Sequence, residues 1–265
     1  MTDKSESGDA LARAGKRGRG GETAAPRKLS RLEVDPHPST GGGVFSDDVP
    51  DDDDNRTRGT KAYQLVRHAI ATGTLKPGAR VMESELAALL NMSRTPIREA
   101  IAALEADGLI SLDTARGRVV TKLDYQAIME LYAVREVLES TAAALAARNA
   151  SEMEILALRE MIEMEEQILD DAGKLADHNR KFHEAIYYCS HNRYILKMLE
   201  YIRTAMLLLQ PAGRTGNERR ETALLEHRAI IEAIEARDPS AAETAIRVHV
   251  RRAQQARIKL LLQNP

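Results

Sequence analysis

Beyond Leu123 the chain shows almost continuous helical periodicity, and no other feature limits the possible folds as strongly. Apolar residues recur there at spacings of three and four, as on the buried face of a helix. This periodicity predicts six helices, which we place at residues 125–148, 151–170, 174–189, 193–209, 217–236 and 240–262. The segments between them are short, which favours antiparallel neighbours. We therefore expect an all-α antiparallel helical bundle over residues 123–263.

The composition agrees with helix-on-helix packing and limits the cellular locations that we expect for the chain. Aromatic residues make up 3% of the 265 residues and Trp is absent, so aliphatic residues and Met must form the core. Cys189 is the single cysteine, which excludes an intrachain disulfide and a thiolate zinc cluster and makes a cytoplasmic location the default. No apolar run approaches the ~20 residues of a bilayer span, so we expect no membrane partner. Residues 1–57 hold few apolar residues among Gly, Pro and charge runs, which predicts a disordered tail.

Residues 58–122 carry the pattern of a winged helix-turn-helix, so the whole chain is predicted to be mainly α. A helix containing Tyr63 and Ile70 comes first, a short helix covers residues 83–90, and a longer one runs from 94 to about 107. Asn91 lies in the turn between the last two, where a positive φ is needed and Asn tolerates it. Two short strands at 110–112 and 118–121 then form a wing. Residues 58–121 hold nine Lys and Arg against six Asp and Glu, so the module is mildly basic.

The second helix of such a motif presents its N-terminal residues to the major groove of DNA. Arg94 and Arg98 are four residues apart and share one face, where their guanidinium groups suit guanine edges or phosphates. The alternative is that both arginines merely decorate a solvated helix face. The predicted DNA-contacting residues are these two arginines, Thr95 as a phosphate contact, Ser93 as the N-cap of the helix, and Arg116 and Gly117 at the tip of the wing.

Three histidines in the helical part have spacings that predict one shared site. His227 lies eleven residues before Asp238 and His249 eleven residues after it, so a turn at Asp238-Pro239 would bring both to the same level. Asn179 and His183 share a face of another helix. Three imidazoles and one oxygen ligand suit a divalent metal ion such as Zn, Ni, Co or Mn. The alternative is that these are ordinary polar histidines. His37, His68, His178 and His191 are not assigned to the site.

These motifs carry a resemblance to a known family of bacterial regulators. Ser93-Arg94-Thr95-Pro96-Ile97-Arg98-Glu99-Ala100 followed by Asp107-Gly108-Leu109-Ile110 looks like the DNA-binding domain of the GntR family, over about residues 59–121. Arg135-Glu136-Val137-Leu138-Glu139, Asn179-Arg180-Lys181-Phe182-His183, Glu226-His227 and His249 resemble the FCD effector domain of its FadR-type subgroup, over about residues 125–262. With six predicted helices rather than seven, this domain resembles the vanillate-regulator branch more than the fatty-acid one.

The resemblance implies a homodimer on a pseudo-palindromic operator, with Arg94, Arg98 and Gly117 among the DNA contacts. It also implies four metal ligands at Asn179, His183, His227 and His249, with Asn where the family usually has Asp. Where a family member uses an arginine for DNA near the start of the second helix, this chain has Ser84.

Family members hold a small carboxylate effector at the metal, and Arg135 could grip such a carboxylate through two hydrogen bonds. A salt bridge to Glu139, four residues on, explains Arg135 equally well. We therefore predict a transcription regulator, not an enzyme, whose operator affinity responds to an organic acid at a metal site. The alternatives are a direct metal sensor, a purely structural metal site and, with less support, a metal-dependent hydrolase.

Overall fold

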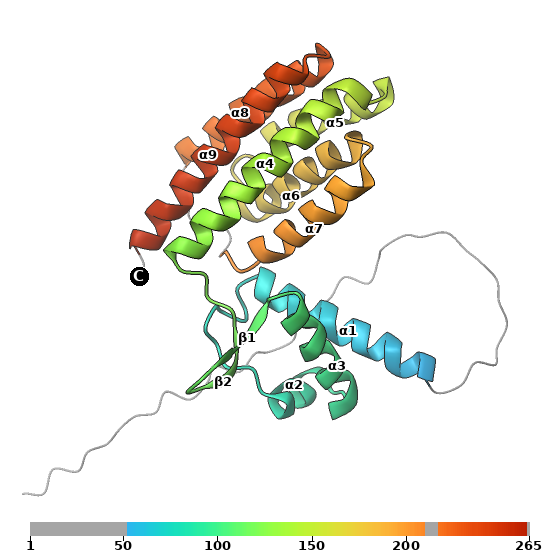
Figure 1. Ribbon diagram of the computed structural model, residues 1–265, viewed down its shortest axis with the longest axis vertical. Coiled ribbons are helices and arrows are strands. Elements are labelled where there is room, and N and C mark those ends of the chain that lie inside the picture. The colour runs from blue at the N-terminus through green and yellow to red at the C-terminus, as the bar shows by residue number, and fades with distance from the viewer. Residues whose placement is uncertain (1–51, 210–216, 264–265) are drawn as a thin grey trace, which may run out of the picture. The chain divides into compact units, whose positions relative to one another are not determined.

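The computed structural model of the chain describes residues 52–209 and 217–263, and these are predominantly helical, as predicted (Figure 1). The first helix, α1 (Asp52–Ala71), begins within the predicted tail, so residues 52–57 are helical. The rest of that tail, residues 1–51, lies outside the described residues. None of the described helices is long and apolar enough to cross a membrane.

The winged helix-turn-helix has the predicted order of elements. Helices α2 (Glu83–Leu90) and α3 (Arg94–Ala106) follow α1, and the wing consists of β1 (Ile110–Asp113) and β2 (Gly117–Val120). The two strands are antiparallel, with Ile110 opposite Val120 and Asp113 opposite Gly117. Asn91 ends α2 in the left-handed conformation, with φ 51°, as the predicted turn requires. The core of this unit is aliphatic and includes the fully buried Ile97, Ile101, Leu104 and Leu109.

The helical part contains the six predicted helices, and most of their ends lie within one to three residues of the expected positions. They are α4 (Tyr125–Asn149), α5 (Glu152–Gln167), α6 (Ala172–Cys189), α7 (Arg193–Met206), α8 (Asn217–Glu235) and α9 (Pro239–Gln263). Side-chain caps fix several of the starts, because a polar side chain there accepts backbone N–H groups that have no helical partner. Asp124, Asp171 and Asn192 cap α4, α6 and α7, and Ser151 forms a capping box with Glu154 at α5.

Helices α4, α8 and α9 run side by side and pack against one another, with α5, α6 and α7 completing the bundle (Figure 1). Small residues at the buried face of α4 permit close packing; they are Ala142, Ala143, Ala146 and Ala147. Larger aliphatic side chains from the other helices fill the core, together with the fully buried Phe182 on α6. The ring centroid of Phe182 lies 4.4 Å from that of His227, so the polar centre described below is enclosed by this apolar core.

Candidate metal centre and DNA-contacting surface

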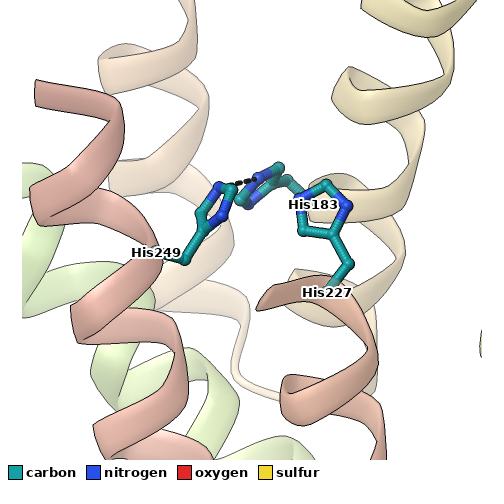
Figure 2. A group of neighbouring side chains, drawn as sticks. All are labelled: His183, His227 and His249. Atoms are coloured by element: carbon teal, nitrogen blue, oxygen red, sulfur yellow. Dashed lines mark hydrogen bonds between the residues drawn. The ribbon is translucent and has the colours of Figure 1, made fainter. Parts of the chain in front are cut away.

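Three histidines from three helices meet inside the bundle (Figure 2). His183 comes from α6, His227 from α8 and His249 from α9, and all three are buried. One ligand nitrogen from each lies within 4.8 Å of the others, and the Nε2 atoms of His183 and His249 are 3.2 Å apart. This is the convergence that the spacing about Asp238 predicts.

The turn between α8 and α9 explains why that spacing works. Arg237 adopts a left-handed conformation with φ 54°, which ends α8. Asp238 then accepts hydrogen bonds from the backbone N–H groups of Ser240 and Ala241 and so starts α9. The two helices therefore run antiparallel from a fixed point, and residues equally distant from it lie at the same level. The ring centroids of His227 and His249 are 4.6 Å apart.

A carboxylate stands behind each imidazole. Nδ1 of His183 lies 3.0 Å from Glu139 Oε2, Nδ1 of His227 lies 2.8 Å from Glu165 Oε2, and Nδ1 of His249 lies 2.8 Å from Glu226 Oε2. For His227 and His249 this contact is a hydrogen bond, which fixes the tautomer, leaves the Nε2 lone pair for a metal and makes it more basic. The contact between His183 and Glu139 is close but is not aligned as a hydrogen bond. All three glutamates are buried. The sequence did not predict these three carboxylates, because they lie on α4, α5 and α8, far along the chain from the histidines that they contact. Glu226 is adjacent to His227 in the sequence, but it contacts His249.

The electrostatics of the centre favour neutral imidazoles, which is the form that binds metal ions. Burial and the two neighbouring imidazoles hold the pKa of His249 well below its usual range. Burial also lowers the pKa of His227, although Glu165 opposes that shift. Within the described part of the chain, the buried Nε2 of His227 has no hydrogen-bond partner. An unpaired buried nitrogen is costly, so this donor set fits a divalent metal ion.

Arg135 forms the salt bridge that the sequence offered as one of two roles. Its Nε lies 2.5 Å from Glu139 Oε1, and both side chains are buried. Burial opposes the charge on Arg135, but Glu139 outweighs this and raises the pKa of the guanidinium. Tyr187 donates a 2.7 Å hydrogen bond to the same oxygen of Glu139. Arg135 thus supports the carboxylate behind His183, and a role in gripping an effector stays a prediction.

The remaining residues near the predicted site have different positions. Asn179 is half-buried one turn before His183, and its role as a ligand stays a prediction. His178 is outside the three-histidine cluster, as expected, but it is 6% exposed, and its Nε2 lies 3.9 Å from Glu165 Oε2. His191 is about half exposed at the surface and contacts Glu154. His37 lies outside the described residues.

On the DNA-binding unit, the predicted contact residues of α3 are exposed at its N-terminal end. Ser93, Arg94, Thr95 and Arg98 face solvent, while Pro96 and Ile97 are buried. Ser93 occupies the predicted N-cap position, but its side chain makes no capping hydrogen bond. Arg98 contacts Glu83 of α2, with Nη2 3.2 Å from Oε2. Because that pair is exposed, exchanging it for a phosphate or a base costs little.

The tip of the wing is held by one carboxylate. Asp113 accepts backbone N–H groups of Ala115 and Arg116, and its other oxygen lies 3.0 Å from the Arg116 guanidinium. Gly117 has a φ of 75°, which other residues rarely adopt, so the backbone of the wing is by itself a physical reason for glycine at this position. Ser84 is exposed on α2, at the position where the resemblance expects an arginine.

Comparisons with known proteins agree with both units. The family described as bacterial regulatory proteins, gntR family, matches residues 58–120, and the FCD domain family matches residues 130–252. The uncharacterized HTH-type transcriptional regulator YdhC of Bacillus subtilis is 34% identical over 190 residues, which cover 71% of this chain and 85% of that protein. A probable D-xylose utilization operon transcriptional repressor of Paenarthrobacter nicotinovorans is 31% identical over 199 residues, 73% of this chain and 87% of that protein.

A solved structure of E. coli McbR/YncC has the same fold, with a TM-score of 0.68 and 24% identity over 77% of this chain and 98% of that one. Both of these relatives are described as transcription regulators and not as enzymes, which agrees with the prediction from sequence. The chain therefore belongs to the gntR family of bacterial regulatory proteins and is a DNA-binding transcription regulator with an FCD effector-binding domain.

Proposed function

We propose that this regulator changes its operator affinity when a small organic acid binds at a metal site in its FCD domain. In this proposal residues 58–122 bind the DNA, and residues 123–263 bind metal and effector and form a homodimer on a pseudo-palindromic operator. The observation that carries it is the convergence of three buried imidazoles, each with a glutamate carboxylate next to its Nδ1. Arg135 contacts one of these carboxylates, that of Glu139. The six helices α4–α9 of the described domain support placement in the vanillate-regulator branch.

In this proposal different residues bind the metal ion and the acid. His183, His227 and His249, with Asn179 as the fourth ligand, would hold a divalent ion such as Zn, Ni, Co or Mn. When bound, such an ion supplies a Lewis-acid contact for one oxygen of a carboxylate. Arg135 uses its Nε–H for Glu139, and a guanidinium has further N–H donors that can reach a second oxygen.

The construction of the site supports a way in which a bound acid could change operator affinity. Its side chains come from α4, α5, α6, α8 and α9, so a ligand between them favours whichever packing of these helices fits it best. Only a ligand with different affinities for two arrangements can shift the balance between them. The same coupling must make operator DNA change the affinity for the acid.

Operator affinity measured by fluorescence anisotropy tests the proposal. The full chain is titrated with and without a panel of small carboxylates, in metal-loaded and chelator-treated form. We expect at least one acid to change the operator affinity of the metal-loaded protein only. His249→Ala should abolish that response and retain DNA binding, while His191→Ala, at the surface, should behave as the parent protein. An operator affinity that ignores every acid contradicts the proposal.

The same titration separates the alternatives. A metal-dependent change in operator affinity without any acid indicates a direct metal sensor. Metal removal that melts the FCD domain and leaves operator regulation unchanged indicates a structural site.

The DNA-contacting assignment has its own test. Arg94→Ala and Arg98→Ala should each weaken specific operator binding by about 1–3 kcal/mol. Arg159→Ala on α5 is the matched control, because it also removes an exposed arginine that pairs with a glutamate. Equal operator affinity in all three variants would rule out these base or phosphate contacts.

A further inference from the structure

A groove outside the three-histidine cluster lies between α5 and α6. Its volume is about 460 Å³, and its lining consists of Met161, Met164 and Ile168 on one side and of Gly173, Lys174, Asp177, His178 and Lys181 on the other. Sites for small organic ligands usually measure about 300–1,000 Å³. The groove therefore has the size of a ligand site, and none of the three clustered histidines lines it.

The two walls of the groove differ in chemistry. The α5 side is apolar, and Met164 is 55% exposed there. Methionine is a flexible side chain that adapts to apolar ligands of varied shape. The α6 side presents the exposed ammonium groups of Lys174 and Lys181, each paired with an exposed aspartate. Exposed pairs of this kind contribute little and can exchange partners, so the wall can accept an anion.

His178 lies in the same wall, and its Nε2 lies near the buried Glu165. Its side chain is 6% exposed, and its buried Nε2 has no hydrogen-bond partner among the residues that the structure describes. Glu165 Oε2 is 3.9 Å away, which is beyond hydrogen-bonding distance. Because this nitrogen is buried, a ligand in the groove does not contact it. The groove thus combines an apolar wall with the two exposed ammonium groups of Lys174 and Lys181.

We propose that this groove binds an amphipathic organic anion, such as a medium-chain monocarboxylate. The apolar chain lies on Met161, Met164 and Ile168, and the carboxylate lies beside Lys174 and Lys181. This site is separate from the three-histidine centre and does not need a metal ion. It is also next to it, since the carboxylate of Glu165 lies 2.8 Å from Nδ1 of His227.

Octanoate is the probe, and isothermal titration calorimetry of the full chain in the presence of a chelator is the measurement. We expect saturable binding, and at least about tenfold weaker binding of 1-octanol, which lacks the charge. Met164→Glu places a carboxylate in the groove and should weaken octanoate binding by about tenfold or more. Met153→Glu is the matched control, because Met153 is 73% exposed at the start of the same helix, outside the groove lining. Its affinity should stay within about twofold of the parent protein.

Two results would overturn the proposal. One is the absence of saturable octanoate binding, and the other is equal binding by the Met164→Glu and Met153→Glu variants. Octanoate that binds only when metal is present also contradicts it, because the acid then occupies the three-histidine centre. The proposed function fails on different grounds, namely an operator affinity that no acid changes, so the two failures can be told apart.

Discussion

Replacing Arg135 by Met should destabilise the FCD domain strongly, because it leaves the buried Glu139 without its cation. Glu139 is 2% exposed, and Arg135 lies 2.5 Å from it. Removing one partner of a buried ion pair typically costs about 3–5 kcal/mol, because the remaining charge is uncompensated. The Tyr187 hydroxyl still donates to Glu139 after the change, which places the expected loss near the lower end of that range.

A second change shows whether the uncompensated charge is the cause. Glu139→Gln removes the charge and keeps an oxygen that accepts from Tyr187. Adding it to Arg135→Met should restore at least about 2 kcal/mol, because the cost of a buried unpaired charge disappears. The control is Arg159→Met, which breaks a pair whose arginine side chain is 57% exposed and should cost less than about 1 kcal/mol.

Urea unfolding of the chelator-treated protein, followed by far-UV circular dichroism, measures these free energies. The described chain is mainly helical, so the signal reports the loss of α4–α9. The reasoning is refuted if Arg135→Met costs less than about 1 kcal/mol or if the two changes add without recovery.

Two further changes test local features of the fold. Gly117→Ala should cost about 1–2 kcal/mol by thermal unfolding, because its φ of 75° is strained for alanine although the space around an added Cβ is open, whereas Gly173→Ala should not destabilise. The pKa of Glu154 is lowered from 4.5 to about 2 by the backbone N–H of Ser151 and by His191, so its contribution is complete above pH 4.5 and is lost as the pH falls from 4.5 towards 2. Because this side chain is 34% exposed, we expect only about 1 kcal/mol, and Glu154→Gln should flatten the acid limb of a stability-against-pH curve by that amount.

The fold could be predicted from sequence because its signals are local. The six helices of the FCD domain begin and end at capping residues and breakers, such as Ser151 and Asp238, that act within a few residues. The spacing about Asp238 even predicts that His227 and His249 meet, since an antiparallel pair turns sequence distance into height along a helix. The start of α1 could not be predicted in this way, because residues 52–57 are helical but show no apolar periodicity.

The supporting groups of the metal centre could not be predicted in the same way. The carboxylate of Glu165 reaches His227 across 62 residues of sequence, and that of Glu139 reaches His183 across 44. Such pairs depend on how helices pack, and a single sequence contains no signal for that register. His178 illustrates the same limit, because its position on the helix excludes it from the cluster but does not reveal that it packs against α5.

Charge balance at the centre points to Glu165 as the carboxylate that depends most on a metal ion. Glu139 is paired with Arg135, and Glu226 lies 3.0 Å from Arg219 and 3.1 Å from Arg252. The contacts of Glu165 within the described residues are two imidazoles, His227 and His178, and Glu165 is 1% exposed.

A buried charge with so little compensation is unfavourable, and a divalent cation next to His227 would offset it. Glu165→Gln should therefore stabilise the chelator-treated protein and, at the same time, weaken metal binding by about 10–100-fold. Glu226→Gln, whose carboxylate already has two arginines, should weaken metal binding without stabilising the metal-free protein. Melting temperatures with and without metal, together with metal competition against a chelator, measure both effects. A Glu165→Gln variant that melts earlier than the parent protein in chelator would show that Glu165 is already compensated and that the centre does not need a cation for charge balance.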